Sequence, residues 1–139
     1  MHENKLLCVK LKNYGSVIKG DYWCLPGGSV ENGESLIIAM GREMVEETAV
    51  APDIGNILYL NHFKINDKEH IEFFFHIKNA EDYIHVDLSK ASHAEEEIAE
   101  IDFIAPSENH LLPDFLKRED IAGQIIDPQG TKYFSNLPV

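Results

Sequence analysis

The sequence predicts a mixed α/β fold in which helices cover both faces of a mixed β-sheet, an α/β/α arrangement. Segments typical of strands lie before and after one well-defined helix, and a second helix-like segment follows late in the chain. No internal repeat, low-complexity tract or linker interrupts this pattern. A length of 139 residues with 44% apolar residues is enough to build one hydrophobic core. We therefore expect a single domain over residues 1–139.

The first quarter of the chain contains two short extended segments. Residues 5–12 (KLLCVKLK) are rich in apolar types and predict the first strand. Residues 13–21 contain two glycines and an asparagine and predict a loop. Residues 22–25 predict a brief extended segment ending at Pro26, because a residue before proline is pushed towards extended geometry.

The clearest helix is predicted over residues 35–48. Ser35 is a suitable N-cap, and Pro52 stops any extension a few residues later. Apolar residues recur at near-helical spacing and predict one apolar face, formed by Leu36, Ala39 or Met40, Met44 and Val45.

A β-hairpin is predicted after this helix. Residues 57–65 (ILYLNHFKI) and 70–78 (HIEFFFHIK) have the β-branched and aromatic content of two strands. Residues 66–69 (NDKE) have the composition of a hairpin turn.

The last third of the chain predicts one strand and a second helix. Residues 80–94 are polar and predict a long loop with a short strand near 83–88. Residues 98–104 alternate apolar and polar types as a strand does. Residues 108–119 predict a helix with a buried apolar face, and the stretch from Gly123 onwards is ambiguous.

The charge balance excludes several classes of partner. Acidic residues outnumber basic ones by 24 to 12, which gives a formal charge of −12. Such a protein gains nothing from counterion release, so we expect neither nucleic acid nor an anionic membrane as partner. No stretch reaches the roughly 18 apolar residues of a membrane span, and no signal-peptide core is found, so we expect a cytoplasmic protein. Cys8 lies in an apolar run and is expected in the core.

An acidic cluster lies within the predicted helix. Glu43, Glu46 and Glu47 are spaced so that their carboxylates share one side of the helix. Three like charges repel each other there, and the C-terminal half of a helix prefers cations. The arrangement becomes favourable if a hard divalent cation binds among the carboxylates. A solvated helix face is the alternative interpretation of the cluster alone.

A longer pattern favours the metal interpretation. Its fixed positions would coincide by chance roughly once in ten million starting points. The pattern resembles the Nudix hydrolase signature, G-x5-E-x7-R-E-U-x-E-E-x-G-U with U apolar, and its matching residues are Gly28, Glu34, Arg42, Glu43, Met44, Glu46, Glu47 and Val50. The resemblance is specific for the family but weak for the substrate.

The resemblance implies a Nudix fold and a Mg²⁺-dependent enzyme, with Mn²⁺ as the alternative metal. Nudix hydrolases cleave the diphosphate linkage of a nucleoside diphosphate joined to another moiety, by water attack. The expected partner is therefore a small nucleoside diphosphate derivative. A Nudix-fold module that binds a nucleotide without cleaving it is the alternative, although the complete set of acidic signature residues argues against it.

Carried over residue by residue, the resemblance implies a role for each matched position. The metal ligands would be Glu43, Glu46 and Glu47 with the backbone carbonyl of Gly27. Arg42 would orient Glu43, and Glu34 would support the metal site. The general base would be Glu46, Glu47 or an acid of the run 95–97, where we single out Glu96 as a further metal ligand; a solvated loop is the alternative for that run.

Substrate contacts are less defined. Lys10 matches a place where relatives set a basic residue on the phosphate, although an ordinary surface lysine is the competing interpretation. Gly28, the first residue of the signature, is the second expected substrate contact. Aromatic residues of the strands could stack on a base but are more often core. These are Tyr22, Tyr59, Phe63, Phe74 and Tyr83. Neither the marker proline of ADP-ribose-cleaving relatives nor the tyrosine of dinucleoside-polyphosphate relatives is found in residues 63–68.

The sequence departs from the family pattern at two places. Ala49 replaces the last glycine of the signature, and an alanine in left-handed geometry there costs about 1–2 kcal/mol. Relatives also carry a strand ahead of the one predicted at residues 5–12. An open sheet edge would favour pairing with a second copy, so a homodimer is a further expectation.

Overall fold

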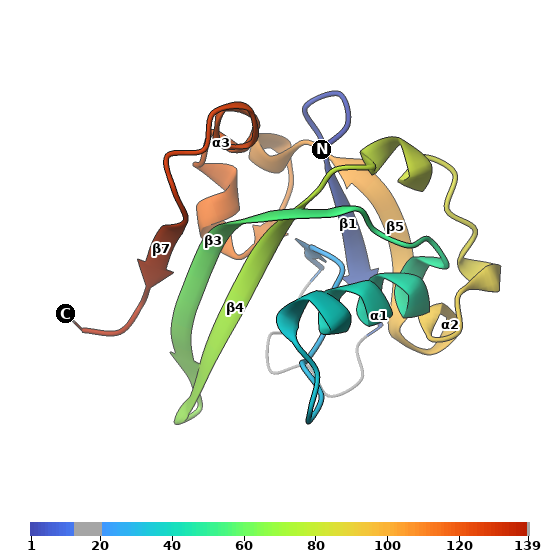
Figure 1. Ribbon diagram of the computed structural model, residues 1–139, viewed down its shortest axis with the longest axis horizontal. Coiled ribbons are helices and arrows are strands. Elements are labelled where there is room, and N and C mark those ends of the chain that lie inside the picture. Colours follow the sequence, from blue (N-terminus) through green and yellow to red (C-terminus); the bar gives the residue numbers. More distant parts are fainter. Residues whose placement is uncertain (13–20, 139) are drawn as a thin grey trace.

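The computed structural model describes residues 1–12 and 21–138 and has a mixed α/β architecture. It contains two sheets, one on each side of a central core (Figure 1). The first has the order β5-β1-β2-β6 and the second the order β4-β3-β7. The predicted fold class is confirmed, with the sheet divided into two parts. Within the described residues, no helix is both long and apolar enough to cross a membrane.

The first sheet is built around β1 (Leu6–Leu11). β1 pairs antiparallel with β5 (Ile98–Ile104) and touches β2 (Trp23–Cys24) at the pair Val9 and Cys24. β2 in turn pairs in parallel with β6 (Leu111–Leu112). The predicted extended segments at 5–12, 22–25 and 98–104 are therefore confirmed, whereas most of the loop expected at 13–21 lies outside the described residues.

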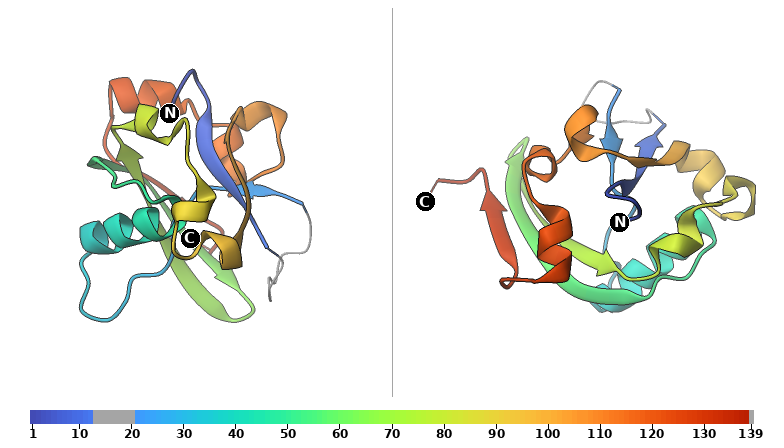
Figure 2. Two further views of the ribbon diagram at one scale, coloured as in Figure 1. Left: turned by 90° about the vertical axis from the view of Figure 1, so that its right-hand side faces the viewer. Right: turned by 90° about the horizontal axis from the view of Figure 1, so that it is seen from above.

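The second sheet is a long hairpin with a short third strand. β3 (Ile54–Ile65) and β4 (Lys68–Ile77) pair antiparallel and curve around one side of the molecule (Figure 2), and β7 (Lys132–Ser135) lies parallel to β3. The predicted hairpin is confirmed, with a tighter turn than expected. Asn66 and Asp67 form it with φ values of 49° and 63°, a conformation that Asn and Asp tolerate better than most residues.

The helices are short apart from α1 (Leu36–Thr48). The others are α2 (Ala94–Glu97) and α3 (Ile121–Ile126). Four 3-10 helices, η1 (Ala80–Tyr83), η2 (Leu88–Lys90), η3 (Pro106–Glu108) and η4 (Asp114–Lys117), complete the described elements. The short strand expected near 83–88 is wrong, because this stretch holds 3-10 turns, with Asp87 capping the second through the N–H of Ser89.

The helix expected over 108–119 is also wrong. Pro113 has no N–H to donate and disfavours helical geometry at the residue before it. The segment therefore splits into η3, the two-residue strand β6 beside β2, and η4. The side chains of Leu111, Phe115 and Leu116 are nevertheless buried. The apolar pattern therefore indicated the buried residues correctly, although the backbone is not the predicted helix.

The main core lies between the two sheets. Cys8 of β1 is fully buried in it, as expected, and burial raises the pKa of its thiol to about 12. Aromatic rings close the other side, with Phe115 and Phe134 stacked at a centroid distance of 4.3 Å. α1 contributes Ala39 and Met44 to the buried residues, whereas Val45 is 45% exposed, so the predicted apolar face is wrong at that position. The fourth turn instead buries Glu47, which places a carboxylate inside the protein.

Candidate active site

The candidate site begins where the loop that contains Gly27 and Gly28, here called the glycine loop, meets α1. Ser35 caps the helix by accepting a 3.2 Å hydrogen bond from the N–H of Ile38, as the sequence predicted. The loop before it approaches the helix closely at Gly28. A Cβ atom at this position would lie 2.3 Å from the carboxyl carbon of Glu43 and 2.4 Å from both its oxygens. Only a residue without a side chain allows the loop to rest against Glu43.

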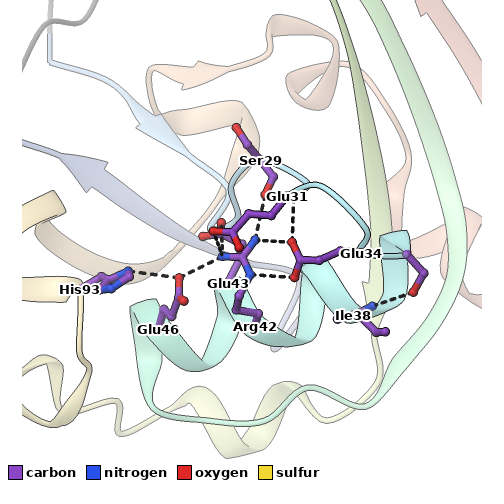
Figure 3. A network of polar contacts seen from close by, with 9 residues as sticks. Ser29, Glu31, Glu34, Ile38, Arg42, Glu43, Glu46 and His93 are labelled. Atoms are coloured by element: carbon purple, nitrogen blue, oxygen red, sulfur yellow. Dashed lines mark hydrogen bonds and ion pairs between the residues drawn. The ribbon is translucent and has the colours of Figure 1, made fainter.

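Arg42 is the centre of the polar network on this helix (Figure 3). Its Nε and Nη2 donate to the two oxygens of Glu34 at 2.8 and 2.9 Å, a bidentate pair. Its Nη1 donates to Glu43 at 2.8 Å and to Glu46 at 3.1 Å. Nη2 also donates to the carbonyl of Ser29 at 2.9 Å. One guanidinium thus ties the loop to two acidic residues of the helix.

The charges in this network support each other. The hydrogen bonds from Arg42 hold the pKa of the Glu34 carboxyl below its usual range, with the N–H of Glu31 adding to the effect. The same bonds raise the pKa of Arg42 above its already high value. Arg42 contacts Glu43, as the resemblance implied, and it also pairs with Glu34, a contact that the sequence did not predict; the expected role of Glu34 in supporting a metal site stays a prediction.

Glu47 lies apart from this network, on the buried side of α1. Its side chain is 2% exposed, and its Oε2 accepts a 2.9 Å hydrogen bond from the N–H of Gly27. Burial raises its pKa to about 8; the bond from Gly27 opposes this shift, and the charges of Glu43, Glu97 and Glu46 add to it. A carboxylate this poorly compensated is a candidate functional group. Gly27 meets it through its N–H, a contact that sequence reasoning missed because it looked only at the carbonyl.

The segment before β5 contacts the helix through His93. Nδ1 of the His93 ring lies 3.1 Å from Oε2 of Glu46. The backbone N–H of His93 donates to the backbone carbonyl of Glu46 at 3.0 Å. Glu96, singled out from sequence, is exposed, and its side chain makes no hydrogen bond or ion pair within the described parts of the chain. Glu97 is the acid of this run whose charge reaches Glu47. A histidine one residue before a helical turn gave no sequence signal for this contact.

Lys10 lies on β1 with its ammonium already paired. It forms ion pairs with Asp21 at 3.0 Å and Glu100 at 3.6 Å. It also lies 4.7 Å from the centre of the Trp23 ring, a cation–π contact. Its expected contact with a phosphate stays a prediction, and such a contact would compete with both carboxylates.

The residues present fit a divalent cation, although they are not arranged around one. Among residues 1–12 and 21–138, no three His, Cys, Asp or Glu side chains form a ready-made ligand group. However, Glu43 and Glu46 already converge on one cationic atom, Arg42 Nη1. Glu47 supplies a third hard oxygen donor with a single hydrogen-bond partner, Gly27, among the described residues. Oxygen donors of this kind suit Mg²⁺ or Mn²⁺.

A large cavity extends from this loop across both sheets. Its volume is about 1170 Å³, and its lining includes Gly27, Gly28 and Glu43. The lining also includes Asn61 of β3 and Glu72 of β4, which are opposite each other in the register. Cys24 also lines the cavity: burial raises the pKa of its thiol to about 11, and the charges of Glu47 and Glu72 add to the shift. Asn61 and Glu72 were not singled out from sequence, although a polar pair within two aromatic strands was visible.

Comparison with known proteins gives consistent matches. The model of the NUDIX domain family matches residues 2–122. An ADP-ribose pyrophosphatase from Methanocaldococcus jannaschii is 43% identical over 56 residues, which cover 40% of this chain and 31% of that protein. The alignment thus spans about a third of the length of this relative.

Three solved structures share the fold. The E. coli ORF135 protein has a TM-score of 0.66 at 20% identity, covering 93% of this chain and 88% of that one. A MutT protein from Methanosarcina mazei Go1 has a TM-score of 0.64 at 24% identity, covering 88% of each chain. A UDP-X diphosphatase has a TM-score of 0.67 at 22% identity, covering 96% of this chain and 62% of that one. At these identities the likeness establishes the fold alone.

Proposed function

The chain belongs to the Nudix family, and we propose that it is a Mg²⁺-dependent pyrophosphohydrolase acting on a small nucleoside diphosphate derivative. The observation that carries this proposal is the meeting of the glycine loop with the acidic face of α1. Gly28 lies against the Glu43 carboxylate, and Gly27 lies against that of Glu47. The same cavity runs from this point across the sheets and has room for the rest of a nucleotide.

The proposed roles follow from the contacts. Glu43, Glu46 and Glu47 would hold the metal, with the Gly27 carbonyl as a further ligand. Bound there, the cation would neutralise the diphosphate and lower the pKa of a water molecule. This charge compensation is needed because the chain carries a formal charge of −12 and repels an anionic substrate.

The protein's own groups would position the ligands and accept a proton. Arg42 holds Glu43 and Glu46 in place while Glu34 fixes the guanidinium from the other side. His93 holds Glu46 from the segment before β5. The general base would be Glu46, Glu47 or an acid of the run 95–97. In the metal-free protein, burial raises the pKa of Glu47 to about 8, and a cation bound to its carboxylate would lower that pKa again.

The proposal is tested by assaying hydrolysis. The protein is incubated with Mg²⁺ and, in turn, nucleoside triphosphates, ADP-ribose, dinucleoside polyphosphates and nucleotide sugars, and released phosphate is detected through a coupled phosphatase. We expect turnover of at least one class, no turnover with excess EDTA, and a fall of at least about a hundredfold when Glu46 and Glu47 are both changed to Gln.

The matched control is Glu81→Gln, which removes an exposed carboxylate far from α1 in sequence. This variant should keep full activity. Binding of nucleotides without turnover would point to the non-catalytic alternative, and turnover that survives the double Glu46→Gln, Glu47→Gln change would show that the metal ligands are assigned wrongly.

A further inference from the structure

The inner face of the β3–β4 hairpin has one polar pair between two aromatic pairs. Residues opposite each other on antiparallel strands share a face. Along this face the register gives Tyr59 with Phe74, then Asn61 with Glu72, then Phe63 with His70. The first pair is packed into the core, and the last consists of rings stacked at a centroid distance of 5.2 Å. A half-buried carboxylate in such a surface is costly unless something satisfies it.

Glu72 has little compensation from the protein itself. Asn61 Nδ2 donates to its Oε2 at 3.2 Å, and this is its one hydrogen bond within the described residues. No Lys or Arg nitrogen of those residues lies within ion-pair distance of it. Burial accordingly raises the pKa of Glu72, while the bond from Asn61 and the charge of His70 oppose the shift. The second oxygen, Oε1, accepts no hydrogen bond from the described residues.

This pair faces the same cavity as the proposed metal site. Asn61 and Glu72 line the cavity together with Gly28 and Glu43. The charges of Glu47 and Glu72 both act on Cys24, so both carboxylates lie near β2. A molecule with its diphosphate at the glycine loop would therefore extend towards the Asn61–Glu72 pair.

We propose that the Asn61–Glu72 pair recognises the exocyclic amino group of the substrate's nucleobase, and so selects adenine, cytosine or guanine over their oxo counterparts. The inference rests on the proposed function, since it assumes a nucleotide substrate. The amino group donates to Oε1 of Glu72, while the second N–H of the Asn61 amide donates to the neighbouring acceptor of the base. An oxo group at the same position would bring an acceptor against an acceptor.

The flat surfaces beside the pair suit a base as well. The stacked rings of Phe63 and His70 border it on one side and the ring of Phe74 on the other. A heterocycle placed edge-on to Glu72 thus has apolar neighbours along its length, and its polar edge meets the single polar pair of this face. Hydrogen bonds of this type distinguish a matching base from a mismatched one by about tenfold or more.

The test measures binding without hydrolysis. The ligands are α,β-methylene nucleoside diphosphates, in which the bridge between the two phosphorus atoms is not hydrolysed. Their affinities are measured by calorimetry in Mg²⁺ for three matched pairs: adenosine and inosine, cytidine and uridine, guanosine and xanthosine. We expect the amino member of at least one pair to bind about tenfold or more tightly. Glu72→Gln and Asn61→Ala should each reduce this ratio to below about threefold. The matched control Glu69→Gln, on the opposite face of β4, should leave it unchanged.

The outcomes separate this inference from the proposed function. Equal affinities within all three pairs, tighter binding of an oxo member, or a preference that survives Glu72→Gln would overturn the base assignment. Thermal melting establishes that each variant is folded. If either Glu72→Gln or Asn61→Ala does not fold, the other variant still tests the pair. Hydrolysis without an amino preference removes only this inference, whereas an amino preference without hydrolysis of any substrate removes only the enzymatic proposal.

Discussion

The backbone N–H of Gly27 donates a 2.9 Å hydrogen bond to Oε2 of the buried Glu47. The bond joins the glycine loop to the last turn of α1 and is the one hydrogen bond that Glu47 receives from the described residues. It does not offset the cost of burial, which raises the pKa of Glu47 to about 8. The ionised form of Glu47 is therefore unfavourable in the metal-free protein, and a cation bound beside it would stabilise that form.

The first prediction concerns the stability of the metal-free protein. The pKa of Glu47 is about 8 in the folded chain against 4.5 as the reference. Between these values the folded chain holds a proton that the unfolded chain has released, so the free energy of unfolding falls as the pH rises. The stabilisation that comes from protonated Glu47 is fully present below pH 4.5 and lost above pH 8. In EDTA, the melting temperature should fall between pH 5 and 8.

The variant Glu47→Gln isolates this effect from the other titrating groups. Its melting temperature should fall less over the same pH range, by a difference on the order of 5 °C. Added Mg²⁺ should stabilise the wild-type protein more at pH 8 than at pH 5, because a larger share of the Glu47 carboxylate is ionised there, and it should stabilise the variant less at both pH values. Parallel pH profiles for the two proteins would contradict the raised pKa.

The second prediction concerns the close approach of Gly28 to Glu43. In Gly28→Ala, the new Cβ would lie 2.3 Å from the Glu43 carboxyl carbon, so this side chain must move away from its position. The Glu43 side chain is 14% exposed and held by Arg42 at 2.8 Å, so its displacement disturbs this contact while the apolar core residues of the helix stay in place. We expect kcat/KM to fall on the order of a hundredfold with little change in melting temperature.

The control for this change is Gly41→Ala on the same helix. Nothing lies within 4 Å of a Cβ at position 41. Alanine is the better helix former, so this variant should gain up to about 1 kcal/mol in stability and keep its activity. A similar loss of activity in both variants would show that the contact with Glu43 is not the cause.

The third prediction concerns two buried tyrosines. The Tyr59 hydroxyl is buried with no hydrogen-bond partner among the described residues, whereas the Tyr83 hydroxyl donates to the carbonyl of Val50 at 3.1 Å. Removing an unpaired hydroxyl relieves a desolvation cost, while removing a paired one loses a bond. Urea denaturation should show Tyr59→Phe unchanged or more stable by up to about 1 kcal/mol, and Tyr83→Phe less stable by about 1 kcal/mol. The reverse order would contradict the hydrogen-bond assignment.

Local sequence patterns predicted the elements that depend on local interactions. The capping of α1 by Ser35, the hairpin turn at Asn66 and Asp67, and the strand at 98–104 are set by neighbours in sequence. The signature also suggested the contact between Arg42 and Glu43, whereas the bidentate pair of Arg42 with Glu34 was not predicted. In these cases the interacting residues are a few positions apart or belong to one recognisable pattern.

Features that depend on tertiary contacts could not be predicted in this way. The strand Leu111–Leu112 exists because β2, some ninety residues earlier, pairs with it; in isolation the same residues fit an amphipathic helix. The contact of His93 with Glu46 and the pairing of Asn61 with Glu72 likewise join distant segments. The burial of Glu47 was missed for the same reason, because periodicity alone assigned Val45 to the apolar face.

The last prediction follows from the departure of Ala49 from the signature. The structure places this residue at the C-cap of α1 with φ 61° and ψ 15°, the left-handed conformation that the missing glycine would adopt freely. Its N–H donates to the carbonyl of Val45 at 2.8 Å, so the helix ends in a left-handed cap even though the residue there is alanine. Ala49→Gly should relieve the strain but also increase the entropy of the unfolded chain, for a net gain of about 0.5–1 kcal/mol in urea denaturation. Ala51→Gly is the control, because Ala51 is exposed and has no left-handed φ, so glycine there brings only the entropic cost and should destabilise the protein by up to about 1 kcal/mol. If both variants lose stability alike, the left-handed geometry at Ala49 carries no strain and the helix tolerates alanine without cost.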